Sequence, residues 1–96
     1  MDEGLVLSEL PYSTYNRLCK YMDIDEGWKR LASAFGYSIR QIMTLGLEYM
    51  RPNGSPTDKL LWDLCTRDVT VGEFQEKLSE SNLLQGLSIL HAGGNM

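Results

Sequence analysis

The feature that most constrains the fold of this chain is a helical spacing of apolar residues that recurs along most of its length. Two segments carry the full pattern i, i+3, i+4 and i+7: Tyr15, Leu18, Cys19 and Met22 in the first, and Trp28, Leu31, Ala32 and Phe35 in the second. Residues with this spacing fall on one face of an α-helix, so each segment predicts a helix with one buried face. No segment alternates between apolar and polar residues with period two, and we therefore expect no β-strand.

Residues that favour helix ends divide the chain into six helical segments. Ser, Thr, Asp and Asn stabilise a helix N-terminus because their side chains accept a backbone N–H that has no partner inside the helix. We expect the first helix to begin near Pro11, and the next five to be capped by Asp25, Ser38, Ser55, Thr70 and Asn82. Gly36 is expected to end the second helix in a left-handed conformation.

The later segments also carry apolar stripes, which are shorter than the first two. They comprise Ile39, Ile42 and Met43 in the third helix, Leu60, Leu61, Leu64 and Cys65 in the fourth, Val71, Phe74 and Leu78 in the fifth, and Leu83, Leu84, Leu87, Ile89 and Leu90 in the sixth. The core candidates are Leu18, Trp28, Leu31, Phe35, Leu61, Leu64, Phe74, Leu78 and Leu87. Six short helices joined by short loops predict an all-α fold, a compact six-helix bundle.

Composition excludes several classes of protein. The 96 residues suffice for one domain, and 43% apolar residues are enough for a packed core. A net charge of −4 argues against nucleic acid as the partner, because phosphate binding needs a basic surface. The start of the chain is acidic and no apolar run is long enough for a membrane span, so we expect a cytoplasmic protein without membrane insertion.

No group of residues indicates catalysis or a cofactor. The single histidine, His91, lies in a Gly-rich stretch, 91–96, that we expect to be a disordered tail or the start of a linker. Cys19 and Cys65 are far apart in the chain and fall in apolar stripes, where they act as small core residues. We therefore expect no metal, no cofactor and no enzymatic activity in this domain.

The charges are unevenly distributed along the chain. Residues 1–26 carry a net charge of −4, residues 27–51 carry +3, and residues 68–96 carry −3. Complementary charged patches steer encounter between proteins and suppress wrong partners, and a basic middle between two acidic flanks would fit such a role. The same distribution also arises from ordinary solvated helix faces.

Two runs of residues resemble a known family. The run Asp25-Glu26-Gly27-Trp28-Lys29-Arg30-Leu31-Ala32, followed by Phe35-Gly36, resembles the second helix of a death domain. The run Ser55-Pro56-Thr57-Asp58-Lys59-Leu60-Leu61-Trp62-Asp63-Leu64, followed by Val69-Thr70-Val71-Gly72-Glu73-Phe74, is similar to the fourth and fifth helices of the interleukin-1-receptor-associated kinases and their insect relative Pelle. Family members often carry a tryptophan where this chain has Leu64, and the third helix has no matching motif.

The resemblance implies an antiparallel death-domain bundle at residues 10–90, preceded by an acidic extension at residues 1–9. It implies oligomeric assembly with other death-domain proteins, adaptors or kinases, including homo-oligomers, in Toll and interleukin-1-receptor signalling, with this chain as the N-terminal part of a kinase. The expected partner-binding residues are basic Lys29, Arg30, Arg40 and Arg51, acidic Glu9, Asp23, Asp25, Glu26, Glu73 and Glu76, and Trp62. Trp62 lies at the edge of an apolar face, where we expect it to cover a neighbouring helix or, if exposed, to anchor a partner.

Two alternatives remain open at this stage. One is a death domain of a different adaptor, receptor or nuclear factor kappa-B-type protein, since these also carry a related second helix. The other is a structural helical bundle with no death-domain partner. A kinase domain after residue 96 would favour the kinase subgroup over the first alternative. A dilution series in light scattering, for the domain alone and with a candidate adaptor, tests the second alternative.

Overall fold

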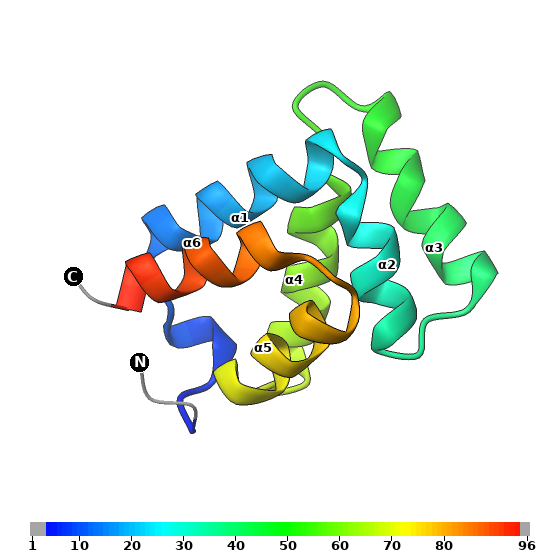
Figure 1. Ribbon diagram of the computed structural model, residues 1–96. Coiled ribbons are helices and arrows are strands. Elements are labelled where there is room, and N and C mark those ends of the chain that lie inside the picture. The colour runs from blue at the N-terminus through cyan, green and yellow to red at the C-terminus, as the bar shows by residue number, and fades with distance from the viewer. Residues whose placement is uncertain (1–3, 95–96) are drawn as a thin grey trace.

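The computed structural model describes residues 4–94, and this part of the chain contains six α-helices (Figure 1). Their bounds are α1 Tyr12–Ile24, α2 Gly27–Ala34, α3 Ile39–Gly46, α4 Pro56–Thr66, α5 Val71–Glu80 and α6 Leu84–Gly94. Two 3₁₀ helices, η1 (Leu7–Glu9) and η2 (Leu47–Met50), precede α1 and follow α3. The predicted all-helical class is confirmed, since the only β pairing in the described residues is one isolated bridge between Val6 and Thr70.

The helices pack around α1, α2 and α4. Helices α1 and α6 lie side by side and run in opposite directions, while α4 contacts α1, α2 and α3 (Figure 1). Helix α5 packs against α2 and α6. Helix α3 and η2 form one side of the molecule, and η1 lies at the other side with the start of α1 (Figure 1).

The core is built from the predicted apolar stripes. Seven of the nine core candidates are completely buried: Leu18, Trp28, Leu31, Leu61, Leu64, Phe74 and Leu78. Phe35 and Leu87 are only partly buried and pack against the edge of this core. Phe35 is the C-cap residue of α2, so it stands at the end of the buried stripe of that helix.

Three of the predicted N-terminal caps form. The Ser38 side chain accepts from the Gln41 backbone N–H, and the Gln41 side chain returns a bond to the Ser38 backbone, which completes a capping box. Ser55 and Thr70 likewise accept from the backbone N–H three residues ahead, at the starts of α4 and α5. Local sequence alone predicted these helix starts because the cap and its partner are only three residues apart.

The other two caps were predicted wrongly. Asn82 adopts a left-handed conformation with φ 59° and ends α5, and α6 begins only at Leu84. Its N–H donates to the Ser79 carbonyl while the Leu83 N–H donates to the Leu78 carbonyl, the Schellman pattern. Asp25 lies at the end of α1 and does not cap α2, whose first residue is preceded by Glu26 in a left-handed conformation.

Gly36 ends α2 as predicted. Its φ is +88°, and its N–H donates to the Ser33 carbonyl while Tyr37 N–H donates to the Ala32 carbonyl. This is again a Schellman motif, in which glycine avoids the cost that a Cβ atom imposes in the left-handed region.

Segments on both sides of the predicted domain 10–90 take part in the described structure. Within the predicted extension 1–9, Leu7 is buried, its N–H donates to the Val69 carbonyl at 2.8 Å, and the Leu5 carbonyl accepts from Val71 N–H at 2.7 Å. The segment from residue 5 therefore belongs to the packed fold, because it pairs with the loop between α4 and α5. At the other end, α6 includes residues 91–94 of the predicted tail, whereas residues 1–3 and 95–96 lie outside the described part.

Candidate protein-interaction surfaces

Helix α3 turns an apolar face to solvent. The sequence predicted Ile39, Ile42 and Met43 as a buried stripe, yet α3 contains no fully buried residue. Ile42 and Leu45 pack against the core, whereas Ile39 and Met43 are exposed. The prediction was wrong in orientation because the apolar residues of residues 39–47 spread over roughly 200° of the helix circumference, at about 100° per residue. Such a helix has more apolar side chains than one neighbouring surface can cover. Of the apolar side chains in α3, only Ile42 and Leu45 meet the bundle.

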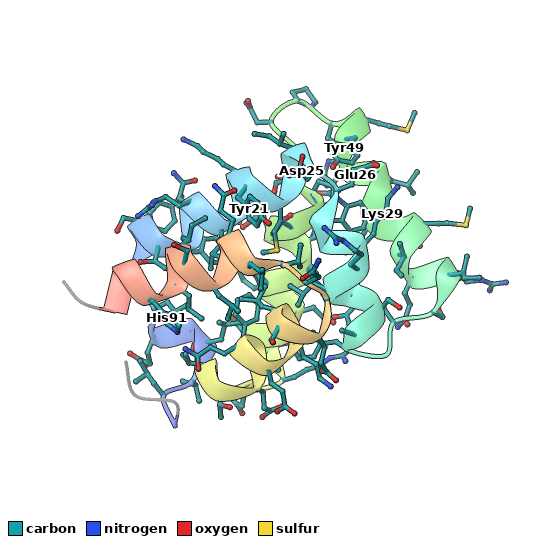
Figure 2. All side chains as sticks on the ribbon, in the orientation of Figure 1. Tyr21, Asp25, Glu26, Lys29, Tyr49 and His91 are labelled. Atoms are coloured by element: carbon teal, nitrogen blue, oxygen red, sulfur yellow. The ribbon has the colours of Figure 1, made fainter. Side chains whose placement is uncertain are left out.

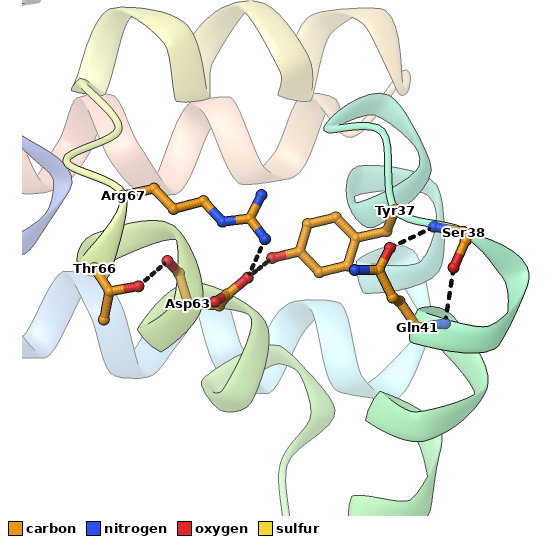
Figure 3. A network of polar contacts seen from close by, with 6 residues as sticks. All are labelled: Tyr37, Ser38, Gln41, Asp63, Thr66 and Arg67. Atoms are coloured by element: carbon orange, nitrogen blue, oxygen red, sulfur yellow. Dashed lines mark hydrogen bonds and ion pairs between the residues drawn. The ribbon is translucent and has the colours of Figure 1, made fainter.

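A polar network attaches the N-terminal end of α3 to α4 (Figure 3). The Tyr37 hydroxyl donates to the Asp63 carboxylate, and the Arg67 guanidinium forms an ion pair with that carboxylate at 3.0 Å. The same guanidinium lies 5.1 Å from the centre of the Tyr37 ring, which is a cation–π contact. Burial and the hydrogen bond to Asp63 raise the pKa of Tyr37 to about 12.

A second network holds η2, at the other end of α3. The Trp28 Nε1–H donates to the Tyr49 hydroxyl at 2.9 Å, and that hydroxyl donates to the Asp23 carbonyl at 2.7 Å. Tyr49 thereby connects η2 to the ends of α1 and α2, and Figure 2 shows it beside Asp25 and Glu26 at this junction. Helix α3 and η2 are therefore fixed at both ends, and their exposed face has a defined shape.

Trp62 lines a groove on a different surface. Its side chain is 64% exposed, so it does not cover a neighbouring helix as expected. It is exposed because it stands about 100° around the axis of α4 from the buried Leu61. The groove has a volume of about 690 Å³ and is lined by Leu7, Ser8, Leu10, Tyr12, Tyr15, Asp58, Trp62, Cys65 and Thr66. The rings of Tyr12 and Tyr15 stack with their centres 6.0 Å apart. Sequence reasoning missed Leu10 and Tyr12 because the groove combines η1, α1 and α4.

The basic residues of α2 have intramolecular contacts but stay accessible. Lys29 Nζ lies 3.2 Å from Glu26 Oε1, in an ion pair whose two side chains are about half exposed. Arg30 is exposed and its Nη1 donates to the Ser81 carbonyl at 3.3 Å. The structure thus places Lys29 beside one of the acids that was predicted to meet it in a partner (Figure 2).

Arg40 and Arg51 differ in their surroundings. Arg40 is exposed on α3, and no ion pair involves it among the side chains that the structure describes. Arg51 pairs with Glu48 at 3.2 Å, which offsets its charge. Among the described side chains, neither Arg30 nor Arg40 has a counter-ion, and Arg40 also lacks the carbonyl acceptor that Arg30 has in Ser81.

The Asp23 carboxylate is engaged in contacts within the domain. Its carboxylate accepts from the Ser55 hydroxyl, from the Thr57 hydroxyl at 2.6 Å and from the Thr57 backbone N–H at 3.0 Å. Ser55 is the N-cap of α4 and Thr57 lies in its first turn, so Asp23 joins the end of α1 to the start of α4. Asp58, in the same turn, accepts from the Tyr15 hydroxyl.

The remaining predicted acids lie on the surface. Glu73 and Glu76 are exposed on α5, Glu9 is exposed on η1, and Asp25 is exposed after α1. Glu73 stands near its own cap, with Oε1 3.5 Å from the Thr70 hydroxyl. Glu73 and Glu76 thus lie on α5, whereas Asp25 and Glu26 lie in the turn between α1 and α2.

The cysteines and the histidine do not form a metal centre in the described residues, where no cluster of three or more potential ligands occurs. Cys19 is buried, and burial raises the pKa of its thiol to about 12. Burial also raises the pKa of the Cys65 thiol. Both cysteines are free thiols. Across residues 4–94, no helix has both the length and the apolar character that crossing a membrane requires.

Comparisons of the chain with protein-family models, with curated proteins and with solved structures gave no match.

Proposed function

We propose that this domain is a non-catalytic protein–protein interaction module that assembles signalling oligomers through contacts of the death-domain type. The observation that carries the proposal is the clustering of large exposed apolar side chains on two separate surfaces, the outside of α3 with η2 and the groove at Trp62. Contiguous exposed apolar patches are typical of surfaces that bind other proteins. The two surfaces differ from each other, which suits heterologous contacts that build open assemblies.

The type of domain is supported by where the resembling motifs lie. The Gly-Trp-Lys-Arg-Leu-Ala run forms α2, and its Trp28 is completely buried at the centre of the bundle. The Ser-Pro-Thr run begins α4, and the Thr-Val-Gly run begins α5. These positions favour the subgroup of the interleukin-1-receptor-associated kinases and Pelle, with an adaptor or kinase of Toll-type innate immune signalling as the partner.

In addition to the two apolar surfaces, exposed charges offer a contact between copies of the domain, in which Lys29 and Arg30 of one molecule pair with Glu73 and Glu76 of its neighbour. Both basic residues lie on α2 and both acids lie on α5, so the two patches are on different helices and can join molecules head to tail. Exposed ion pairs add little to folding, about 0–1 kcal/mol. Across an interface, however, placing like charges together can cost several kcal/mol.

Charge reversal tests the proposal. We expect Arg30→Glu and Lys29→Glu to leave the unfolding free energy within about 1 kcal/mol of wild type and to weaken assembly at least tenfold, which corresponds to about 1.4 kcal/mol. Assembly is measured by light scattering over a dilution series, for the domain alone and mixed with the death domain of a Toll-pathway adaptor. Lys20→Glu, a change at an exposed α1 lysine outside the patch, is the matched control and should assemble like wild type.

A charge swap sharpens the test. Combining Arg30→Glu with Glu76→Lys should restore part of the lost assembly, because the reversed pair is again complementary. If Arg30→Glu and Lys29→Glu each assemble as wild type does, the basic patch is only a solvated face and the proposed contact is wrong.

A further inference from the structure

The outer face of α3 and η2 carries several large apolar side chains that are exposed to solvent. We define the outer α3 face by four side chains and their exposed fractions: Ile39 79%, Met43 68%, Leu47 57% and Met50 82%. The first three are spaced i, i+4 and i+8, so they form a ridge about 12 Å long at 1.5 Å per residue. Beside this ridge is a depression of about 560 Å³, which Arg40 and Thr44 also line.

Folding does not require this face to be apolar. The opposite side of α3 already supplies the contacts with the bundle through Ile42 and Leu45. Exposed side chains contribute little to stability, so polar residues at positions 39, 43, 47 and 50 would leave the core unchanged. Four large exposed apolar side chains on one face are therefore better explained by a partner that covers them.

The face is also presented rigidly. The network of Tyr37, Asp63 and Arg67 fixes the N-terminal end of α3 (Figure 3), and the hydrogen bonds of Tyr49 to Trp28 and Asp23 fix η2. A preorganised surface loses less conformational entropy on binding than a mobile one. Methionine at two of the four positions adds side chains that can adapt to an apolar partner.

Charge indicates what kind of partner this is. Helix α3 contains no carboxylate, and its one charged side chain, Arg40, has no ion pair among the described side chains. The nearby Glu48 is paired with Arg51. Two copies meeting through this same face would bring together two faces of equal, positive sign, which opposes such a contact. A partner that carries carboxylates beside its apolar residues is complementary to this face.

We propose that the outer α3 face binds an amphipathic helix of a partner protein, whose apolar stripe is flanked by carboxylates. The stripe packs against Ile39, Met43 and Leu47 and enters the depression that they line, with anchors one helical turn apart. A flanking carboxylate pairs with the Arg40 guanidinium. We call the intermolecular contact proposed above, between α2 of one molecule and α5 of its neighbour, the α2–α5 contact. The binding of the partner helix does not depend on it, because it uses neither Lys29 and Arg30 nor the acids of α5.

Two synthetic helical peptides serve as probes. Each has roughly 15 residues, about four helical turns, with leucines spaced i, i+3, i+4 and i+7. The flanking positions are glutamate in the acidic probe and lysine in the basic probe. We expect the folded domain to bind the acidic probe at least tenfold more tightly in fluorescence anisotropy, and the preference to decrease as salt is added.

Substitutions in the outer α3 face test whether the probes bind there. Met43→Gln should weaken the acidic probe at least fivefold, because it replaces an exposed apolar anchor by a polar side chain of similar length. Arg40→Glu should reverse the preference between the two probes. Leu84→Lys, a change at a 62% exposed leucine on α6, is the control and should bind both probes like wild type. Circular dichroism and urea unfolding establish that each variant is folded.

Two results would overturn the proposal. Equal binding of both probes, unaffected by Arg40→Glu, would mean that the face only attracts apolar surface without selecting acids. Failure to bind either probe, together with self-association of the domain that Met43→Gln abolishes, would identify a second copy as the occupant. Loss of the α2–α5 assembly in the Arg30→Glu variant with unchanged probe binding would leave this inference intact.

Discussion

The two tryptophans have opposite environments although both lie in helical segments with apolar neighbours. Trp28 is completely buried, and its indole N–H donates to the Tyr49 hydroxyl. Trp62 is mostly exposed and lines the groove between α1 and α4. The difference arises because Trp28 belongs to an i, i+3, i+4, i+7 stripe, whereas Trp62 stands beside the stripe of α4.

Truncating the two tryptophans should have very different effects on stability. Trp28→Ala is expected to lower the unfolding free energy by about 3–5 kcal/mol, because it removes a large buried ring and leaves a cavity. That is a large part of the roughly 5–15 kcal/mol that a domain possesses. Trp62→Ala should change it by only about 0.5 kcal/mol. Urea unfolding measures both, and similar losses in the two variants would contradict the burial described here.

Asp23 and Asp25 provide a matched pair of acids at the end of α1. The Asp23 carboxylate accepts three hydrogen bonds from Ser55 and Thr57, while Asp25 is exposed. We expect Asp23→Ala to destabilise the fold by about 1–3 kcal/mol, because it leaves the partly buried donors at the start of α4 without an acceptor. Asp25→Ala should be nearly neutral in the same thermal and urea measurements. An Asp23→Ala protein as stable as wild type would return Asp23 to the list of surface acids.

At the scale of elements, short-range caps and long-range networks have separate roles. Side-chain caps fix the starts of α3, α4 and α5, and Schellman motifs fix the ends of α2 and α5, all through partners a few residues away. How a helix is oriented on the bundle depends instead on contacts between distant residues, such as Tyr37 with Asp63. Helix α3 depends on such contacts most, because it has no fully buried side chain.

The α3–α4 network predicts a loss of stability at alkaline pH. The pKa of Tyr37 is raised to about 12 in the folded protein, from about 10 in the unfolded chain, mainly by burial. The folded state therefore favours the neutral phenol, and this contribution is fully present below about pH 10 and is lost as the pH rises towards 12. Tyr15 acts in the same direction, since burial and its hydrogen bond to Asp58 raise its pKa.

We expect Tyr37→Phe to show a smaller decrease in unfolding free energy between about pH 8 and pH 11 than wild type, because it removes one ionising group whose pKa folding raises. The measurement is urea unfolding at a series of pH values. Tyr12→Phe, which changes an exposed tyrosine, is the control and should retain the wild-type decrease. An unchanged pH dependence in Tyr37→Phe would show that this phenol does not couple ionisation to folding.

At the scale of the whole molecule, the fold distributes its exposed groups over distinct surfaces. Helix α2 presents Lys29 and Arg30, α5 presents Glu73 and Glu76, and the apolar ridge lies on α3. No two of these surfaces are the same, so one molecule can contact different neighbours at the same time. Such an arrangement suits a module that assembles with partners.

Assembly through the α2–α5 contact should weaken with salt. Charges on the surface are screened over about 8 Å at physiological ionic strength and over about 3 Å at 1 M. We expect the midpoint concentration of assembly in light scattering to rise steadily with added NaCl for wild type. Arg30→Glu should show a flatter dependence, because its attractive pair is already lost. A salt-independent wild-type assembly would assign the contact to apolar residues instead.

The sequence by itself determined the class of the fold, the number of helices and most of the core. Leu18, Leu31, Leu61 and Phe74 were predictable because helical spacing places side chains on one face by local geometry. The starts of α3, α4 and α5 were predictable because a cap acts on a backbone group only three residues away.

The tertiary structure alone decided which side of α3 faces the bundle, which partners Asp23 has, and that Leu7 is buried. In residues 39–47 the apolar residues cover more than half of the helix circumference, so local periodicity permits either side to be buried. The side that is buried depends on α2 and α4, which approach from distant parts of the chain. Asp23 likewise stands at a helix end, where its carboxylate could cap a helix or form long-range hydrogen bonds. The proximity of Ser55 and Thr57 selects the long-range bonds, because several donors stabilise a carboxylate more than one does.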